Sequence, residues 1–369
     1  MTRVVLAPDS FKGTISAADA AKALAEGWAT VDQTVEFVHR PMADGGEGTV
    51  AAFAAAVPGA RRMPVTVEGP AGEAVDTSWL LLPPTPDAPA GTAVIDLAST
   101  SGIEMLKELR PWDADTTGLG QAMVAALDHG VSRLVVGIGS SASTDGGTGM
   151  LTALGARFFD AAGLPVARGA RGLEDIVAVD LTELRRAPDV RVLTDVTNPL
   201  IGVRGATAVF GPQKGLDSAA EIARIDDALR NLAELLDIDP ATPGTGAAGG
   251  TGAALVVWGG VLSPGAAEVA TLIGASEAIA GADVVVTGEG SYDGQSGDGK
   301  VPSFLASIAS RHRVPAVLAA GRITADADTA LFAHSVSLTD LAGSSEAALA
   351  EPGRWLRDAG AALARATAS

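Results

Sequence analysis

Polar side chains that could do chemistry follow several short apolar runs of the sequence, each beside glycine. They are Asp9, Ser10 and Lys12 after RVVLAP (3–8), Asp44 after EFVHRP (36–41), and Glu289 and Asp293 in and after DVVVTGEG (283–290). Gly45 and Gly46 follow Asp44 directly and are site candidates with it. The runs are typical of buried parallel strands, whose carboxyl ends share one edge of a sheet, where ligands bind. A capped turn explains any single loop. Their joint occurrence predicts a ligand-binding edge.

A further loop, GIGSSASTDGGTG (137–149), follows the apolar run RLVV. As a dinucleotide-binding turn, its Gly137, Gly139 and Ala142 fit G-x-G-x-x-A, with Asp160 near the ribose. The residues after Ala142 are poor helix formers, so we expect the helix to begin near Thr148, which favours a cradle for a smaller anion. A structural turn is the third interpretation. The cradle residues would be Gly139, Ser140, Ser141, Asp145, Gly146 and Gly147.

Three lysines adjoin glycine directly: Lys12, Lys214 and Lys300. A lysine that reaches a phosphate from a tight loop needs such a neighbour, whereas a solvated surface lysine does not. GQSGDGKV (294–301) resembles a P-loop but carries Val301 where a P-loop has Ser or Thr, so we reject a P-loop enzyme. Lys300 stays a candidate phosphate-side cation, and Lys12 and Lys214 are candidate catalytic cations.

The stretch VLTDVTNPLIG (192–202) places Asp195 and Asn198 after another apolar run. A carboxylate there could bind Mg²⁺ or accept a proton from a hydroxyl, whereas an Asx turn is the simpler alternative. We interpret Asp195 and Asp44 as the leading candidates for metal binding and for proton acceptance.

The elements that must position these residues alternate between strand and helix, which is typical of an α/β fold with a parallel sheet. The middle of the chain holds more strands and two hairpin-like segments, VTVEGPAGEAV and ARFFDAAGLPV, which favour a mixed sheet. We therefore expect a Rossmann-like parallel-sheet domain built from both chain ends (1–70 and 281–369). A mixed α/β domain (71–280) is inserted into it.

The segment DPATPGTGAAGGTG (239–252) has two interpretations. Its composition is that of a flexible linker, but an apolar run follows at once, so its glycines also fit a loop that opens a helix.

Composition excludes several classes of protein. A net charge of −18 opposes binding to nucleic acid or to an anionic membrane surface. Cysteine is absent, which excludes disulfides and thiolate metal sites. The sequence contains neither an apolar run of about 18 residues nor a signal-peptide pattern, so the expected location is the cytoplasm.

Eight motifs occur in an order that resembles the bacterial glycerate kinase family. They are APDSFKG, MADGGEGT, GIGSSASTDGGTGM, DVTNPLIG, FGPQKG, GTGAAGGTGAAL, TGEGSYDGQS and GKVP, and they extend over nearly the whole chain from Val4. The sequence departs at Ser291 and Tyr292, where the motif is expected to carry an arginine and an aliphatic residue. It also departs at Thr144, where asparagine is expected.

The resemblance implies a two-domain enzyme that uses ATP and Mg²⁺ to phosphorylate D-glycerate, with 2-phosphoglycerate favoured over 3-phosphoglycerate as product. Because Lys12 and Lys300 belong to the terminal domain and Lys214 to the insert, we expect the site in a cleft between the domains. The alternatives are an NAD-dependent oxidoreductase that uses the 137–142 turn and a non-catalytic protein that binds a small anion. The sequence leaves open whether the chain is a monomer or a homodimer.

Overall fold

The computed structural model describes residues 1–11, 13–294 and 300–368, and the chain forms two compact units. Unit 1 comprises residues 1–44, 51–58 and 264–369, and unit 2 comprises residues 45–50 and 59–263. The expected boundary at residue 70 lies inside unit 2, because residues 61–68 form a strand of that unit. The expected boundary at residue 280 lies inside unit 1, because residues 265–280 form helices of that unit.

Unit 1 is built on a five-stranded sheet, called sheet A here, with strand order β13-β12-β11-β1-β2. Its strands are β1 (Arg3–Pro8), β2 (Glu36–His39), β11 (Val284–Tyr292), β12 (Ala316–Ile323) and β13 (His334–Ser337). Its helices are α1 (Ala17–Ala29), α10 (Gly265–Leu272), α11 (Ala275–Ala280), α12 (Val301–His312), α13 (Leu338–Ala342), α14 (Ser345–Ala350) and α15 (Pro352–Thr367). The helix α2 (Thr49–Ala56) begins in unit 2 and continues in unit 1.

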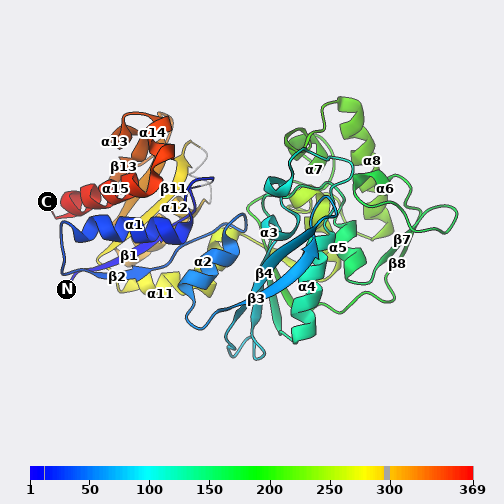
Figure 1. Ribbon diagram of the computed structural model, residues 1–369, viewed down its shortest axis with the longest axis horizontal. Coiled ribbons are helices and arrows are strands. Elements are labelled where there is room, and N and C mark those ends of the chain that lie inside the picture. Colours follow the sequence, from blue (N-terminus) through cyan, green and yellow to red (C-terminus); the bar gives the residue numbers. More distant parts are fainter. Residues whose placement is uncertain (12, 295–299, 369) are drawn as a thin grey trace. The chain divides into compact units, whose positions relative to one another are not determined.

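Every pair of neighbouring strands in sheet A is parallel. Strand β1 lies between β2 and β11, and the strand order reverses between β1 and β11. Helices α1 and α15 lie side by side over one face, in blue and red (Figure 1). There Leu24 and Leu356 join Leu6 and Val286 in a buried core. The parallel sheet expected from both chain ends is confirmed, and ligands of such sheets bind at the carboxyl edge, where the strand order reverses.

Unit 2 is built on a six-stranded sheet, called sheet B here, with strand order β10-β9-β6-β5-β4-β3. Its strands are β3 (Arg61–Glu68), β4 (Ala74–Leu82), β5 (Thr92–Asp96), β6 (Arg133–Gly137), β9 (Asp189–Leu193) and β10 (Val261–Ser263). A separate hairpin pairs β7 (Arg157–Phe159) with β8 (Ala178–Asp180). Its helices are α3 (Ala98–Ser101), α4 (Thr117–His129), α5 (Thr148–Ala153), α6 (Ala170–Leu173), α7 (Ala206–Phe210), α8 (Ala219–Leu235) and α9 (Thr251–Val257), with short 3₁₀ helices at Ile103–Met105, Pro212–Lys214 and Ala247–Gly250.

Sheet B is mixed, as expected for the inserted domain. Strands β3, β4 and β5 pair antiparallel, whereas β5, β6, β9 and β10 pair parallel. The segment 239–252 is no linker, because Gly249 and Gly250 are buried and α9 begins at Thr251. Within the described ranges, no helix has the length and apolar character needed to cross a bilayer.

Candidate active site

In unit 1, the predicted residues after β1 lie against the end of β11. The backbone N–H of Asp9 donates to the carbonyl of Gly288 (2.8 Å), and the N–H of Ser10 donates to Asp9 Oδ1 (2.6 Å). Glu289 follows Gly288 on β11, and its side chain is nearly buried. The structure therefore brings Asp9, Ser10 and Glu289 to one edge of sheet A. Lys12 lies outside the described residues.

A charged pair extends the same edge beyond β11. The Nζ of Lys300 lies 3.6 Å from Oδ1 of Asp293, and Lys300 directly precedes α12. A cation beside a helix N-terminus favours the binding of an anion, because the helix dipole and its unpaired N–H groups add to the positive charge. Asp44 is also a predicted site residue of unit 1, and it is half-buried in the loop after β2.

In unit 2, the loop between β6 and α5 is organised around the carboxylate of Asp145, which is fully buried. Five groups donate to it: Thr116 N–H (3.0 Å) and Oγ1 (2.7 Å), Ser143 Oγ (2.9 Å), and the N–H groups of Gly147 (3.2 Å) and Gly149 (3.2 Å). These bonds compensate the cost of burying the charge. Asp145, Gly146 and Gly147 thus lie inside the unit, and the partly exposed residues of this loop are Gly139 and Ser140.

Lys214 lies beneath the same loop and is only 3% exposed. Its ammonium donates to the backbone carbonyl of Ser143 and contacts Ser141 Oγ at 3.5 Å. Burial lowers the pKa of Lys214 to about 8, and the nearby carboxylate of Asp145 partly opposes this shift. The structure therefore joins Lys214, Ser141 and Asp145, three predicted site residues, through one network.

The glycine-rich segment 244–250 closes this network from another side. The N–H of Gly146 donates to the carbonyl of Gly249 (3.0 Å), and Ser141 Oγ approaches the carbonyl of Ala248 (3.5 Å). Ser140 and Ala248 both have left-handed backbone, with φ of 59° and 53°. Such conformations are costly outside glycine and concentrate at functional sites.

Gly45 and Gly46 pack against the start of the 137–149 loop in unit 2. The N–H of Gly139 donates to the carbonyl of Gly45 (3.0 Å). A Cβ on Gly139 would lie 2.5 Å from the Cα of Gly46, so any larger residue would push the two loops apart. The predicted Gly45, Gly46 and Gly139 are therefore in direct contact.

Asp195 and Asn198 follow β9, which pairs with β6 in sheet B. Asp195 is exposed two residues after the strand ends. The side-chain amide of Asn198 donates to the backbone carbonyl of Arg204 (2.7 Å), and the backbone carbonyl of Asn198 accepts from the N–H groups of Gly244 and Gly246. Asn198 thus holds the glycine-rich segment, whereas the Asp195 side chain lies at the surface of the unit.

Three residues of the Asp145 network were not among those expected from the sequence. Thr116 and Ser143 bind the carboxylate directly. Asp115 is buried beside it, and burial, with a smaller contribution from the charge of Asp145, raises the pKa of Asp115. A Thr or Asp before a helix is typical of a cap, and nothing local indicates a partner about 30 residues away.

Among the described residues, the protein side chains do not form a metal-binding cluster by themselves. In the described part of the chain, no three His, Asp or Glu side chains gather as they would around a metal ion. Mg²⁺ in phosphoryl-transfer enzymes commonly uses one or two carboxylates together with substrate phosphates and water. A single exposed carboxylate such as Asp195 fits that mode, whereas an all-protein cage does not.

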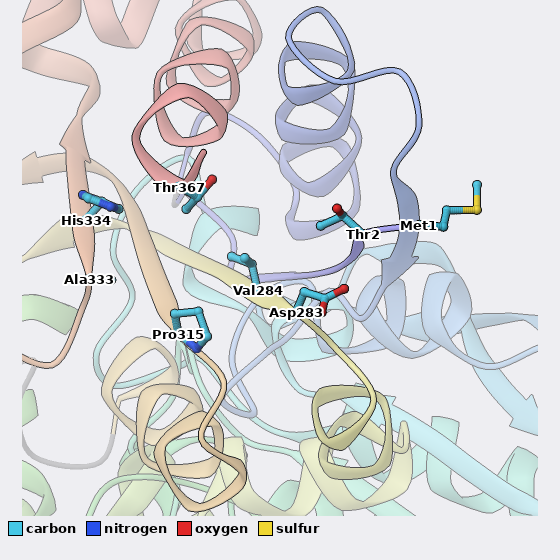
Figure 2. A pocket seen from close by; sticks show the side chains of 8 residues that line it. All are labelled: Met1, Thr2, Asp283, Val284, Pro315, Ala333, His334 and Thr367. Carbon is cyan, nitrogen blue, oxygen red and sulfur yellow. The ribbon is translucent and has the colours of Figure 1, made fainter. Parts of the chain in front are cut away.

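A hollow of about 500 Å³ lies at the opposite edge of sheet A (Figure 2). Its lining includes Thr2, Asp283, Pro315 and Ala333, each directly before a strand. Ligands of open parallel sheets bind at the carboxyl ends of strands, so we do not assign this hollow to the chemistry.

Comparisons with known proteins agree with the resemblance. The model of the glycerate kinase family matches residues 4–368. Glycerate 2-kinase of Escherichia coli (strain K12) is 40% identical over 335 residues, which are 88% of this chain and 86% of that protein. Glycerate kinase of Halalkalibacterium halodurans is 37% identical over 347 residues, covering 91% and 89%.

A solved structure agrees as well. The crystal structure of a Salmonella typhimurium LT2 protein assigned as glycerate kinase 2 matches with a TM-score of 0.85 and 37% identity, covering 100% of this chain and 98% of that one. The α/β fold expected from the sequence is thereby confirmed. With a family model that spans the two units and relatives at this level of identity, the chain belongs to the glycerate kinase family.

Proposed function

We propose that this chain transfers the γ-phosphoryl group of ATP to a hydroxyl of D-glycerate, with 2-phosphoglycerate as product. The observation that carries the proposal is the position of the family motifs at the carboxyl ends of parallel strands. APDSFKG begins in the last two residues of β1, and TGEGSYDGQS includes the end of β11. GIGSSASTDGGTGM begins at the last residue of β6, and DVTNPLIG follows β9. Ligands of α/β proteins bind at such ends.

Phosphoryl transfer needs positioning and charge neutralisation more than covalent chemistry. In unit 2, we assign the exposed part of the 137–149 loop, Gly139 and Ser140, to an oxyanion of a substrate. Lys214 and Asp145 hold that loop from inside. A loop fixed before the substrate arrives needs little reorganisation during the reaction, which is how preorganised donors accelerate transfer.

Asp195 is our candidate for the acid that accepts the hydroxyl proton or holds Mg²⁺, because its exposed carboxylate follows β9, the parallel neighbour of β6 in sheet B. Mg²⁺, when bound, would neutralise phosphate charge. In unit 1, Asp9, Ser10 and Lys300 are candidates for contacts to the second substrate. The prediction that the substrates meet in a cleft between the domains stays a prediction, as do a cytoplasmic location and the choice between monomer and homodimer.

The two alternatives are less well supported. A dinucleotide-binding turn needs a helix that begins inside its glycine pattern, but α5 begins at Thr148, eleven residues after the last residue of β6, Gly137. A protein that only binds a small anion would not need the full set of kinase-family motifs.

A coupled assay of ADP release tests the proposal, with D-glycerate, L-glycerate and no acceptor in parallel. We expect Mg²⁺-dependent release with D-glycerate. Phosphorus NMR of the product identifies the hydroxyl, because the single proton on C2 splits the 2-phosphate signal into a doublet and the two C3 protons split a 3-phosphate into a triplet. ADP release that D-glycerate does not stimulate would refute the activity, and a triplet would reassign the product.

A further inference from the structure

The end of β11 departs from the family motif at a charged position. Ser291 stands where the motif is expected to carry an arginine, and Tyr292 where it is expected to carry an aliphatic residue. Tyr292 is buried, and its hydroxyl lies 3.2 Å from Ser303 Oγ and donates to the carbonyl of Asp328 (3.1 Å). The tyrosine is therefore part of the packing, whereas position 291 carries a hydroxyl in place of the guanidinium that the resemblance implies.

An arginine on the neighbouring strand lies directly opposite this serine. In the parallel pairing of β11 with β12, Ser291 is the register partner of Arg322. The Nη2 of Arg322 donates to Ser291 Oγ at 3.3 Å. The guanidinium group thus lies beside the position from which a side chain at residue 291 would extend.

The hydrogen bond to Ser291 uses only one of the five N–H donors of the Arg322 guanidinium. Its side chain is exposed, and none of the ion pairs found between described residues includes it. A guanidinium carries five N–H donors in a planar fork that matches a carboxylate or a phosphate, and the hydroxyl of Ser291 can accept few of them. By contrast, Arg171 and Arg224 each direct two donors to a carboxylate.

The surroundings of Arg322 belong to the ligand-binding edge of unit 1. Glu289 lies two residues before Ser291, so the two side chains leave the same face of sheet A. Asp293 lies two residues after Ser291 and pairs with Lys300 at the start of α12. Lys300 and Arg322 are thus two cations near the end of β11.

We propose that Arg322 supplies from β12 the guanidinium that the family motif carries at position 291, and that it binds an oxyanion of a substrate. The oxyanion is the carboxylate of glycerate or a phosphate of ATP, and both present the paired oxygen atoms that a guanidinium recognises. The proposal deepens the function proposed above and rests on it. A cation moved to the neighbouring strand explains how the chain keeps the charge at this edge while it lacks the motif arginine.

The test compares Arg322→Ser with the double variant Ser291→Arg/Arg322→Ser, which returns the arginine to β11. Arg311→Ser is the matched control, because Arg311 is an exposed arginine in the last turn of α12, at the other end of that helix from Lys300. We expect Arg322→Ser to raise KM for one substrate about 10- to 100-fold, since a charged hydrogen bond contributes on that scale. The change in kcat should be smaller. The substrate whose KM rises identifies the oxyanion.

The double variant should recover KM to within about threefold of the wild-type value, and Arg311→Ser should leave both KM values unchanged. Unaltered KM values in folded Arg322→Ser would overturn the proposal. A loss that the double variant does not recover would refute the equivalence of the two positions. If the wild-type chain does not phosphorylate D-glycerate, the proposed function fails on its own. Calorimetric titration with ATP and with D-glycerate then still tests Arg322. If wild type and Arg322→Ser bind ATP with the same affinity, and also bind D-glycerate with the same affinity, the role of Arg322 is contradicted.

Discussion

The ammonium group of Lys214 donates to the backbone carbonyl of Ser143 in the interior of unit 2. We expected this lysine to bind a phosphate, but at least one of its three N–H donors holds the 137–149 loop, which carries other candidate site residues. The glycine beside it has a local explanation as well. Gly215 has a φ of 98° and ends the short 3₁₀ helix of Lys214, a conformation that glycine adopts without strain.

Stability should report the buried state of Lys214. Its pKa is lowered to about 8, against 10.5 for an exposed lysine. Between these pH values the unfolded chain keeps the proton that the folded chain has lost, so the contribution of Lys214 to stability rises with pH. The free energy of unfolding of wild type minus that of Lys214→Met should therefore increase between pH 8 and pH 10 and stay constant from pH 6 to pH 7. Urea denaturation measures this difference, and a flat difference up to pH 10 would contradict the buried position.

Two buried threonines offer a matched test of the Asp145 network. Thr116 Oγ1 donates to Asp145 Oδ2 (2.7 Å) and accepts from the N–H of Met150 (2.9 Å), whereas Thr144 Oγ1 is buried with no hydrogen-bond partner in the described ranges. Valine has nearly the shape of threonine. Thr116→Val should lower the free energy of unfolding by about 1–3 kcal/mol, and Thr144→Val should leave it unchanged or raise it. If the two variants lose the same free energy of unfolding, the hydrogen bonds of the Thr116 hydroxyl do not stabilise the Asp145 network.

A pair of glycines separates contact from backbone strain. Gly249 and Gly163 both have positive φ (64° and 75°), but a Cβ on Gly249 would lie 2.2 Å from the carbonyl oxygen of Ser143, whereas a Cβ on Gly163 would have nothing within 4 Å. Gly163→Ala should lower stability by about 1 kcal/mol through its backbone alone. Gly249→Ala should cost about 1–3 kcal/mol more and should also reduce kcat, because it displaces the loop. Thermal and urea denaturation with parallel assays would detect the difference, and identical behaviour would refute the close packing.

Asp195→Asn should reduce kcat about 100-fold or more, since a general base or a metal ligand contributes at least that much. The free energy of unfolding should change little, because the side chain is exposed. Asp217→Asn, at another exposed acid of unit 2, is the control and should keep wild-type kcat. Near-normal turnover of a folded Asp195→Asn variant would reduce Asp195 to a residue of the turn after β9.

The strands that form the two ligand-binding edges could be predicted because their signal is local. The apolar runs at 3–8, 133–136 and 283–290 correspond to β1, β6 and β11 within two residues at either end, and the expected start of a helix near Thr148 is confirmed. Strands of a buried parallel sheet are near-continuous apolar runs over most of their length, so composition locates them.

The partners of the site residues could not be predicted in the same way. Asp145 looked like a ligand contact because a carboxylate among glycines is common in both structural and functional loops, and its burial depends on Thr116, 29 residues earlier. Arg322 was missed because its relation to Ser291 exists only in the register of β11 with β12. Such pairings are set by the packing of whole elements and leave no mark on the residues nearby.

The pairing of β1 with β11 has a consequence for the synthesis of the chain. Val4 pairs with Val284, and the bond from Thr287 to Ala7 spans the same separation of 280 residues. At roughly 5–20 residues per second, β1 leaves the ribosome about 15 to 60 s before its neighbour exists. Unit 2, whose main segment runs from residue 59 to 263, is complete by then. Until β11 arrives, one edge of β1 has no strand to pair with, and an open edge of this kind readily pairs with another chain.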